Sequence, residues 1–203
     1  MLEAVNLSCA RGERRLFSGL NFSLAAGNFL QAFGPNGSGK TSLLRIVCGL
    51  TAPAAGEVRW EGTNIHRLGE EYFGAIAYVA HQNGVKDELN PIENLRISSG
   101  VAGHALSKPE AQVILERMGL SKQRHLPARL LSAGQRRRLA LSRLLASRAR
   151  LWILDEPLAS LDDDGATLAR NLISEHLGND GMAIIATHQE MGLSVGQMQR
   201  VEL

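Results

Sequence analysis

The chain has 203 residues, of which 44% are hydrophobic and 21% are charged, and its net charge is +2. These values are typical of one globular domain with a substantial core, and they argue against strong electrostatic steering toward nucleic acid. No run of about 18 apolar residues predicts a membrane span. The two cysteines, Cys9 and Cys48, form neither a metal motif nor a disulfide framework, which favours a reducing cytosol.

Strands and helices are expected to alternate along most of the chain. Loose or clear alternation predicts strands over 2–8, 16–24 and 57–61, and apolar runs predict buried strands over 28–33, 75–80, 151–154 and 182–186. Helices are expected over 41–48, from the acidic residues 162–164 onward, and within 84–145, where Ser107 and Glu110 form a capping box and Gly119 is a plausible helix end. This order predicts an α/β fold with a largely parallel central sheet and an inserted helical subdomain.

A glycine-rich loop joins the strand at 28–33 to the helix at 41–48. It fits the phosphate-binding pattern G-x-x-x-x-G-K-[ST] with the residues Gly34, Pro35, Asn36, Gly37, Ser38, Gly39, Lys40 and Thr41. The backbone N–H groups and the helix N-terminus attract phosphate oxygens, Lys40 can reach the β- and γ-phosphates, and the Thr41 hydroxyl can ligate Mg²⁺. The loop therefore predicts binding of a nucleoside triphosphate such as ATP.

Two carboxylates, Asp155 and Glu156, follow the apolar strand at 151–154. Ligands bind at the carboxyl ends of strands in open α/β sheets, so Asp155 could hold Mg²⁺ and Glu156 could act as general base toward water. A strand that simply runs into an acidic turn has the same sequence, and these two residues alone do not separate the alternatives. The consecutive Arg136, Arg137 and Arg138 are read as a solvated helix face in preference to a patch that binds polyanions.

The run Leu131, Ser132, Ala133, Gly134 and Gln135 resembles the signature sequence of ATP-binding cassette (ABC) ATPases, with Ala133 in place of one glycine. It precedes the Asp155–Glu156 pair at the spacing typical of that family. The resemblance implies a P-loop ATPase core with an N-terminal antiparallel β subdomain and a helical insertion at about 84–145. It also implies a second copy, bound head to tail in an ATP-dependent manner, whose signature closes over the γ-phosphate.

Further motifs follow in the family's order. Gln82 resembles the Q-loop residue near Mg²⁺ and the attacking water, and His188 resembles the switch histidine that contacts the γ-phosphate. The D-loop, which touches the partner copy, is matched by Ala159, Ser160, Leu161 and Asp162. The resemblance thus implies Glu156, His188 and Gln82 as catalytic residues, and Thr41, Gln82 and Asp155 as metal ligands. Where the family places an aromatic residue against adenine, this chain has Arg11, whose planar guanidinium can also lie on a purine.

A narrower resemblance, to ATP-binding subunits of cytochrome c maturation systems of the haem-exporter type, rests on residues 16–27, 81–95, 131–144, 151–162 and 187–189. It implies a single cassette over 1–203 without a regulatory domain, at the cytoplasmic face of a bacterial inner membrane. A polytopic, CcmB-like membrane subunit would contact about 83–95. Two alternatives stay open: a transporter motor for another small substrate, and a soluble ABC ATPase acting on nucleic acid or protein assembly.

Overall fold

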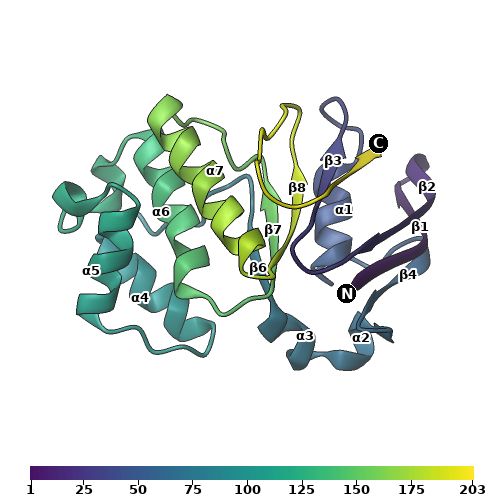
Figure 1. Cartoon of the computed structure of the whole chain (residues 1–203), viewed down its shortest axis with the longest axis horizontal. Coiled ribbons are helices and arrows are strands. Elements are labelled where there is room, and N and C mark those ends of the chain that lie inside the picture. Colours follow the sequence, from purple (N-terminus) through teal and green to yellow (C-terminus); the bar gives the residue numbers. More distant parts are fainter.

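The computed structural model describes residues 1–203, and its strands form two separate sheets (Figure 1). The larger sheet is parallel throughout, with the strand order β6-β7-β8-β3-β9. Its strands are β3 (Phe29–Phe33), β6 (Ile76–Val79), β7 (Leu151–Asp155), β8 (Met182–Ala186) and β9 (Met198–Glu202). The carboxyl ends of parallel strands meet at one edge, where open α/β sheets bind their ligands.

The parallel sheet separates two hydrophobic cores. Along β7, Trp152 and Leu154 belong to the core on the side of the large helices, whereas Leu151 and Ile153 belong to the core on the opposite side. Side chains of a strand alternate between the two faces, so a strand that is buried on both faces has a continuous apolar sequence. This explains why 151–154 and 182–186 are apolar runs without alternation.

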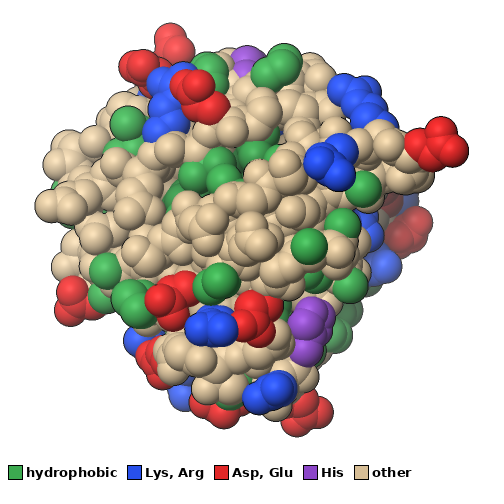
Figure 2. Space-filling model, turned by 90° about the vertical axis from the view of Figure 1, so that its right-hand side faces the viewer, with side chains coloured by type: hydrophobic (Ala, Val, Ile, Leu, Met, Phe, Trp, Pro, Cys, Tyr) green, Lys and Arg blue, Asp and Glu red, His purple; other side chains and the backbone are tan.

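The smaller sheet is antiparallel, with the order β2-β1-β4-β5. It consists of β1 (Leu2–Arg11), β2 (Arg14–Leu24), β4 (Ala55–Trp60) and β5 (Thr63–Asn64). Helix α1 (Lys40–Val47) lies between the two sheets, and its Leu43 and Leu44 share one core with residues of both. On the face seen in Figure 2, acidic and basic side chains are scattered and do not gather into one patch of a single sign.

Four larger helices lie on the other side of the parallel sheet, on the left of Figure 1. They are α4 (Pro91–Val101), α5 (Lys108–Arg117), α6 (Ala133–Ala146) and α7 (Asp163–Gly178). Capping boxes begin α4, α5 and α6 at Asn90, Ser107 and Ser132, and Asp162 caps α7. These side chains accept hydrogen bonds from the free backbone N–H groups of the first turn, which fixes where each helix begins.

The expected α/β architecture, with a parallel central sheet, is confirmed, as is the capping box of Ser107 and Glu110. Gly119 has φ of 65° directly after α5 and its cap residue, as expected for a helix end. The strand predicted over 75–80 is shorter, because Ala75 ends a helix. Two short helices, α2 (Ile65–Leu68) and α3 (Glu70–Ala75), were not predicted. The division of the chain at 84 and 145 stays a prediction. None of the helices has the length and apolar composition needed to cross a membrane.

Candidate functional site

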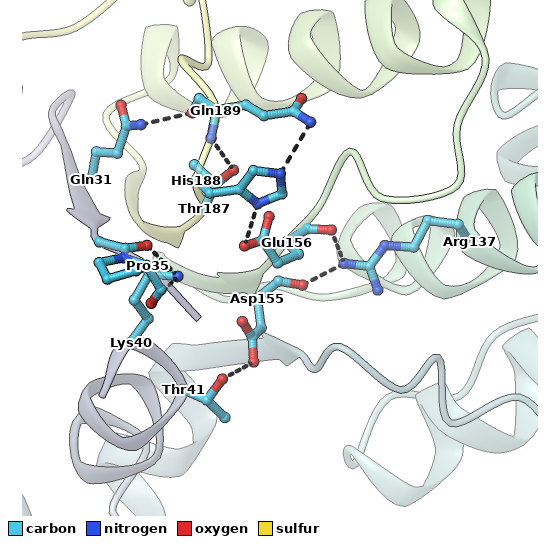
Figure 3. A network of polar contacts seen from close by, with 11 residues as sticks. Gln31, Pro35, Lys40, Thr41, Arg137, Asp155, Glu156, Thr187, His188 and Gln189 are labelled. Atoms are coloured by element: carbon cyan, nitrogen blue, oxygen red, sulfur yellow. Dashed lines mark hydrogen bonds and ion pairs between the residues drawn. The ribbon is translucent and has the colours of Figure 1, made fainter. Parts of the chain in front are cut away.

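The glycine-rich loop connects β3 to α1 as predicted. Gly39 caps the helix with φ of 116°, a conformation that side-chain-bearing residues rarely adopt. Lys40 is buried, and its Nζ donates hydrogen bonds to the Gly34 and Pro35 carbonyls at 2.6 and 3.1 Å (Figure 3). The Ser38 hydroxyl is buried without a hydrogen-bond partner in the chain. A buried, unpaired donor beside a buried ammonium group suits a ligand with phosphate oxygens.

A cavity of about 490 Å³ opens beside this loop. The loop and the start of α1 form its floor, Arg11 and Arg14 from the β1–β2 hairpin border it, and His81, Asp155 and Glu156 line it from the parallel sheet. The volume lies within the range of small-molecule sites. The cavity therefore brings together the predicted phosphate loop, Arg11 and both predicted carboxylates.

Asp155 lies at the end of β7, next to the first turn of α1. The Thr41 hydroxyl donates a hydrogen bond of 2.8 Å to Asp155 Oδ2. Burial raises the pKa of the Asp155 carboxyl above its ordinary value, and the hydrogen bond from Thr41 acts in the opposite direction. Two adjacent oxygen donors, one of them a carboxylate in a partly desolvated position, fit the ligand preference of Mg²⁺.

Glu156 continues the chain after β7 with φ of 48°, in the left-handed region. Its Oε1 lies 3.0 Å from Nδ1 of His188, which follows β8 (Figure 3). Gln189 adds to this network: its Nε2 lies 3.4 Å from His188 Nε2, and its carbonyl accepts a hydrogen bond of 2.8 Å from Gln31 on β3. The structure thus joins the predicted base and the predicted switch histidine directly.

The remaining predicted residues lie around this centre or apart from it. Gln82 is exposed, and it is its neighbour His81 that lines the cavity. Residues 131–135 are absent from the cavity lining; Ser132 is exposed at the start of α6. Gly134 packs closely on the D-loop, since a Cβ there would lie 2.8 Å from the Ser160 carbonyl oxygen. One chain therefore does not bring its signature residues to its own phosphate loop.

The interpretation of Arg136, Arg137 and Arg138 as a solvated helix face is wrong for Arg137. The residue is 2% exposed, and its guanidinium donates hydrogen bonds to the carbonyls of Asp155, Glu156 and Pro157. Burial lowers the pKa of this guanidinium, and nearby Asp155 opposes the shift. The sequence contained a signal that the prediction missed: Arg137 precedes Ala140, Leu141 and Leu144 at helical spacing, on the buried side of α6.

The profile of the ABC transporter family matches residues 17–159. The chain belongs to this family. As an ABC ATPase it binds and hydrolyses ATP, and the cavity beside the phosphate loop is its candidate nucleotide site.

Close relatives and solved structures agree with this family. The ABC ATPase is 52% identical over 202 residues to the cytochrome c biogenesis ATP-binding export protein CcmA of Nitrosospira multiformis, covering 100% of this chain and 98% of the relative. It is 43% identical to the CcmA protein of Pseudomonas aeruginosa, covering 99% of each.

An ATP-binding ABC transporter protein from Pyrococcus furiosus has a TM-score of 0.85 at 25% identity, covering 98% of this chain and 96% of that one. The dimeric structure of a bacterial ABC transporter cassette has a TM-score of 0.84 at 21% identity, covering 100% of this chain and 94% of that one, and shows the shared fold.

Proposed function

We propose that this ABC ATPase is the motor subunit of a membrane export complex that handles haem for the biogenesis of c-type cytochromes. The observation that carries the proposal is the 52% identity, across the whole chain, to a protein named for cytochrome c biogenesis export. The cavity with its phosphate loop and two carboxylates supplies the ATPase part of this function. Haem enters the proposal through the process, because haem is attached to c-type cytochromes during their biogenesis.

In the proposed site, the phosphate loop and Lys40 hold the triphosphate, and Arg11 lies against the base. Thr41 and Asp155, with Gln82 after a movement of its loop, would hold Mg²⁺, which would neutralise phosphate charge. Glu156 accepts a proton from the attacking water at a carboxylate oxygen. His188, 3.0 Å from that carboxylate, orients it and contacts the γ-phosphate. Most of the rate enhancement comes from positioning and charge stabilisation.

A second copy of the chain completes each site. Ser132 and Gly134 lie at the start of α6, away from the cavity of their own chain. In a head-to-tail pair they would meet the γ-phosphate held by the other copy, while residues 159–162 would contact the partner. Helix N-termini bind anions through their free N–H groups, which supports this use of α6.

The membrane partner would dock on a groove between β6, α4 and α6. The groove has a volume of about 420 Å³, and most of its lining is apolar, including Val85 and Leu89 from the segment 83–95. Ile97 and Val101 of α4 also line it and are 51% and 86% exposed. Exposed apolar side chains beside a groove mark an interaction surface. A CcmB-like polytopic subunit that inserts an apolar segment there would hold the ATPase at the cytoplasmic face of the inner membrane.

Deletion of the gene tests the proposed function. We expect the deletion strain to lose covalently bound haem from its c-type cytochromes, as seen by haem staining of denatured protein, while b-type cytochromes persist as the control. The wild-type gene should restore the stain, and a Lys40→Ala gene should not. Normal c-type staining in the deletion strain would contradict cytochrome c biogenesis while leaving the ATPase intact. The proposed partner is tested by copurification: a polytopic membrane protein should copurify with the wild-type chain, and substitutions in the groove should abolish this.

A further inference from the structure

One guanidinium, that of Arg137 on α6, joins three segments of the chain, and Figure 3 shows its bonds to Asp155 and Glu156. Its Nη2 donates to the Asp155 and Glu156 carbonyls at 2.6 and 2.8 Å, and its Nε donates to the Pro157 carbonyl at 3.2 Å. Its Nη1 donates to the Ala80 carbonyl at 2.8 Å and to Asn83 Oδ1 at 3.1 Å. An arginine has five N–H donors, so every one of them has a partner.

The five acceptors show which segments of the chain this side chain holds in place. Three of them are consecutive carbonyls of the turn that carries the Asp155 and Glu156 carboxylates. The other two belong to Ala80 and Asn83, on either side of residues 81 and 82, directly after β6. Both segments supply residues of the proposed ATPase site, and no other side chain hydrogen-bonds to both.

The backbone of Glu156 needs such support. A non-glycine residue with positive φ is strained by about 1–3 kcal/mol and persists only where the surroundings fix it. The Glu156 carbonyl accepts a hydrogen bond from Arg137, and the Glu156 N–H donates a hydrogen bond of 2.8 Å to the Ala186 carbonyl. These two bonds fix both peptide groups that flank the Glu156 side chain, and thereby its direction toward His188.

We propose that Arg137 is a positioning residue for ATP hydrolysis, which holds the Glu156 carboxylate and the segment around Gln82 in their working arrangement. The proposal rests on the proposed roles of Glu156 and Gln82. Arg137 does not line the cavity and has no hydrogen bond to the phosphate loop. Its effect therefore passes through the backbone of the residues that it binds.

Lysine cannot replace this side chain. A lysine has three N–H donors on one atom, whereas the five acceptors around Arg137 surround three nitrogens in a plane. Arg137→Lys keeps the charge but leaves at least two acceptors without a donor. The phosphate loop is not among the acceptors, so ATP binding should persist.

The test measures ATP turnover of the purified chain as a function of ATP concentration. We expect Arg137→Lys and Arg137→Ala to lower kcat by about 10- to 100-fold, as for a misplaced catalytic group, with KM changed less than about threefold. The matched control is Arg117→Ala on α5, which removes an ion pair with Glu175 on the surface and should leave kcat unchanged. Binding of a fluorescent ATP analogue shows that each variant is folded.

Chemical rescue separates positioning from a general structural role. Guanidinium, at concentrations far below those that unfold proteins, should raise the turnover of Arg137→Ala but not of wild type, and urea at equal concentration should not. Wild-type kcat in Arg137→Lys, or loss of ATP binding in step with the rate, would overturn the proposal. Glu156→Gln, measured in parallel, keeps the two hypotheses apart: wild-type turnover in that variant would refute the role of Glu156 itself.

Discussion

Whether the signature residues work on the nucleotide of another copy can be tested by mixing two inactive variants. Lys40→Ala disables the phosphate loop, because the buried Lys40 ammonium is the cation of that loop. Ser132→Asp disables the signature, because it directs a carboxylate toward the γ-phosphate. Each variant alone lacks an intact site if a site combines the loop of one copy with the signature of the other.

The choice of aspartate follows from the capping box of α6. Ser132 Oγ accepts a hydrogen bond of 3.2 Å from the Gln135 N–H, so its own proton remains available for a phosphate oxygen. Losing the cap would cost about 0.5–2 kcal/mol, but aspartate is as good an N-cap as serine, so Ser132→Asp spares the helix. The control is Ser107→Asn in the capping box of α5, because asparagine is also a good N-cap and places no second carboxylate beside Glu110 Oε2, to which Ser107 Oγ donates at 2.6 Å; this variant should keep full activity.

The expected recovery can be calculated. On random mixing in equal amounts, about half of the dimers contain one copy of each variant, and each such dimer has one intact site out of two. Turnover in the mixture should therefore reach about a quarter of the wild-type value if the two sites work independently. Phosphate release is measured for each variant and for the mixture. No recovery on mixing, with both variants shown to bind each other, would refute the shared site; wild-type turnover in Ser132→Asp alone would refute any role of the signature.

Four other changes test separate parts of the structure. Glu156→Gln should lower kcat by about 10²- to 10⁴-fold while ATP still binds, as measured by phosphate release and nucleotide binding, and near-normal turnover would disprove the assignment of the base. Arg11→Ala should weaken ATP binding about two- to fivefold without unfolding the chain, and an unchanged affinity in a binding titration would argue against contact with the base. Val101→Asp should abolish copurification of the membrane subunit and preserve ATPase activity, since Val101 is 86% exposed at the groove and does not line the nucleotide cavity. Burial lowers the pKa of His176 in the folded state below its ordinary value of 6.5, so the unfolded state binds the proton more readily. The free energy of unfolding should therefore fall as the pH falls through about 6.5, by at most about 1.4 kcal/mol per pH unit. His176→Phe, which preserves the stack on Trp152, should reduce that slope in urea unfolding at pH 7.5 and 5.5, and an identical slope would refute this source.

That the phosphate loop and the two carboxylates of the candidate site lie together was predictable, because they form short, contiguous motifs at strand ends. Gly34–Thr41 and Asp155–Glu156 needed only the alternation of strands and helices to be placed at the same edge of a parallel sheet. The two short helices α2 and α3 were not predicted, since four and six residues make fewer than two helical turns and cannot show a repeated apolar spacing. Asn64 could have indicated the start of α2, because asparagine is a good N-cap and its side chain accepts a hydrogen bond from the His66 N–H.

Arg137 could not be read correctly from charge patterning alone. In a run of three arginines, exposure is the usual state of each member, and only the position of each residue on the helix distinguishes them. Arg136 lies at the surface and pairs with Asp87 at 2.7 Å, whereas Arg137 points to the sheet. The carbonyl groups that bind Arg137 are invisible to sequence reasoning, because they depend on how the turn after β7 bends.

That turn explains how one strand end serves three neighbouring elements. In a regular strand, successive side chains point to opposite faces, so Asp155 and Glu156 could not both face the nucleotide cavity. The positive φ of Glu156 breaks the alternation, and both carboxylates line the cavity. Asp155 then meets Thr41 on α1, Glu156 meets His188 after β8, and the carbonyls of both bind Arg137 on α6. Because α6 also begins with the signature residues, a movement of that helix against a partner copy would reach the Glu156 carboxylate through a single buried side chain.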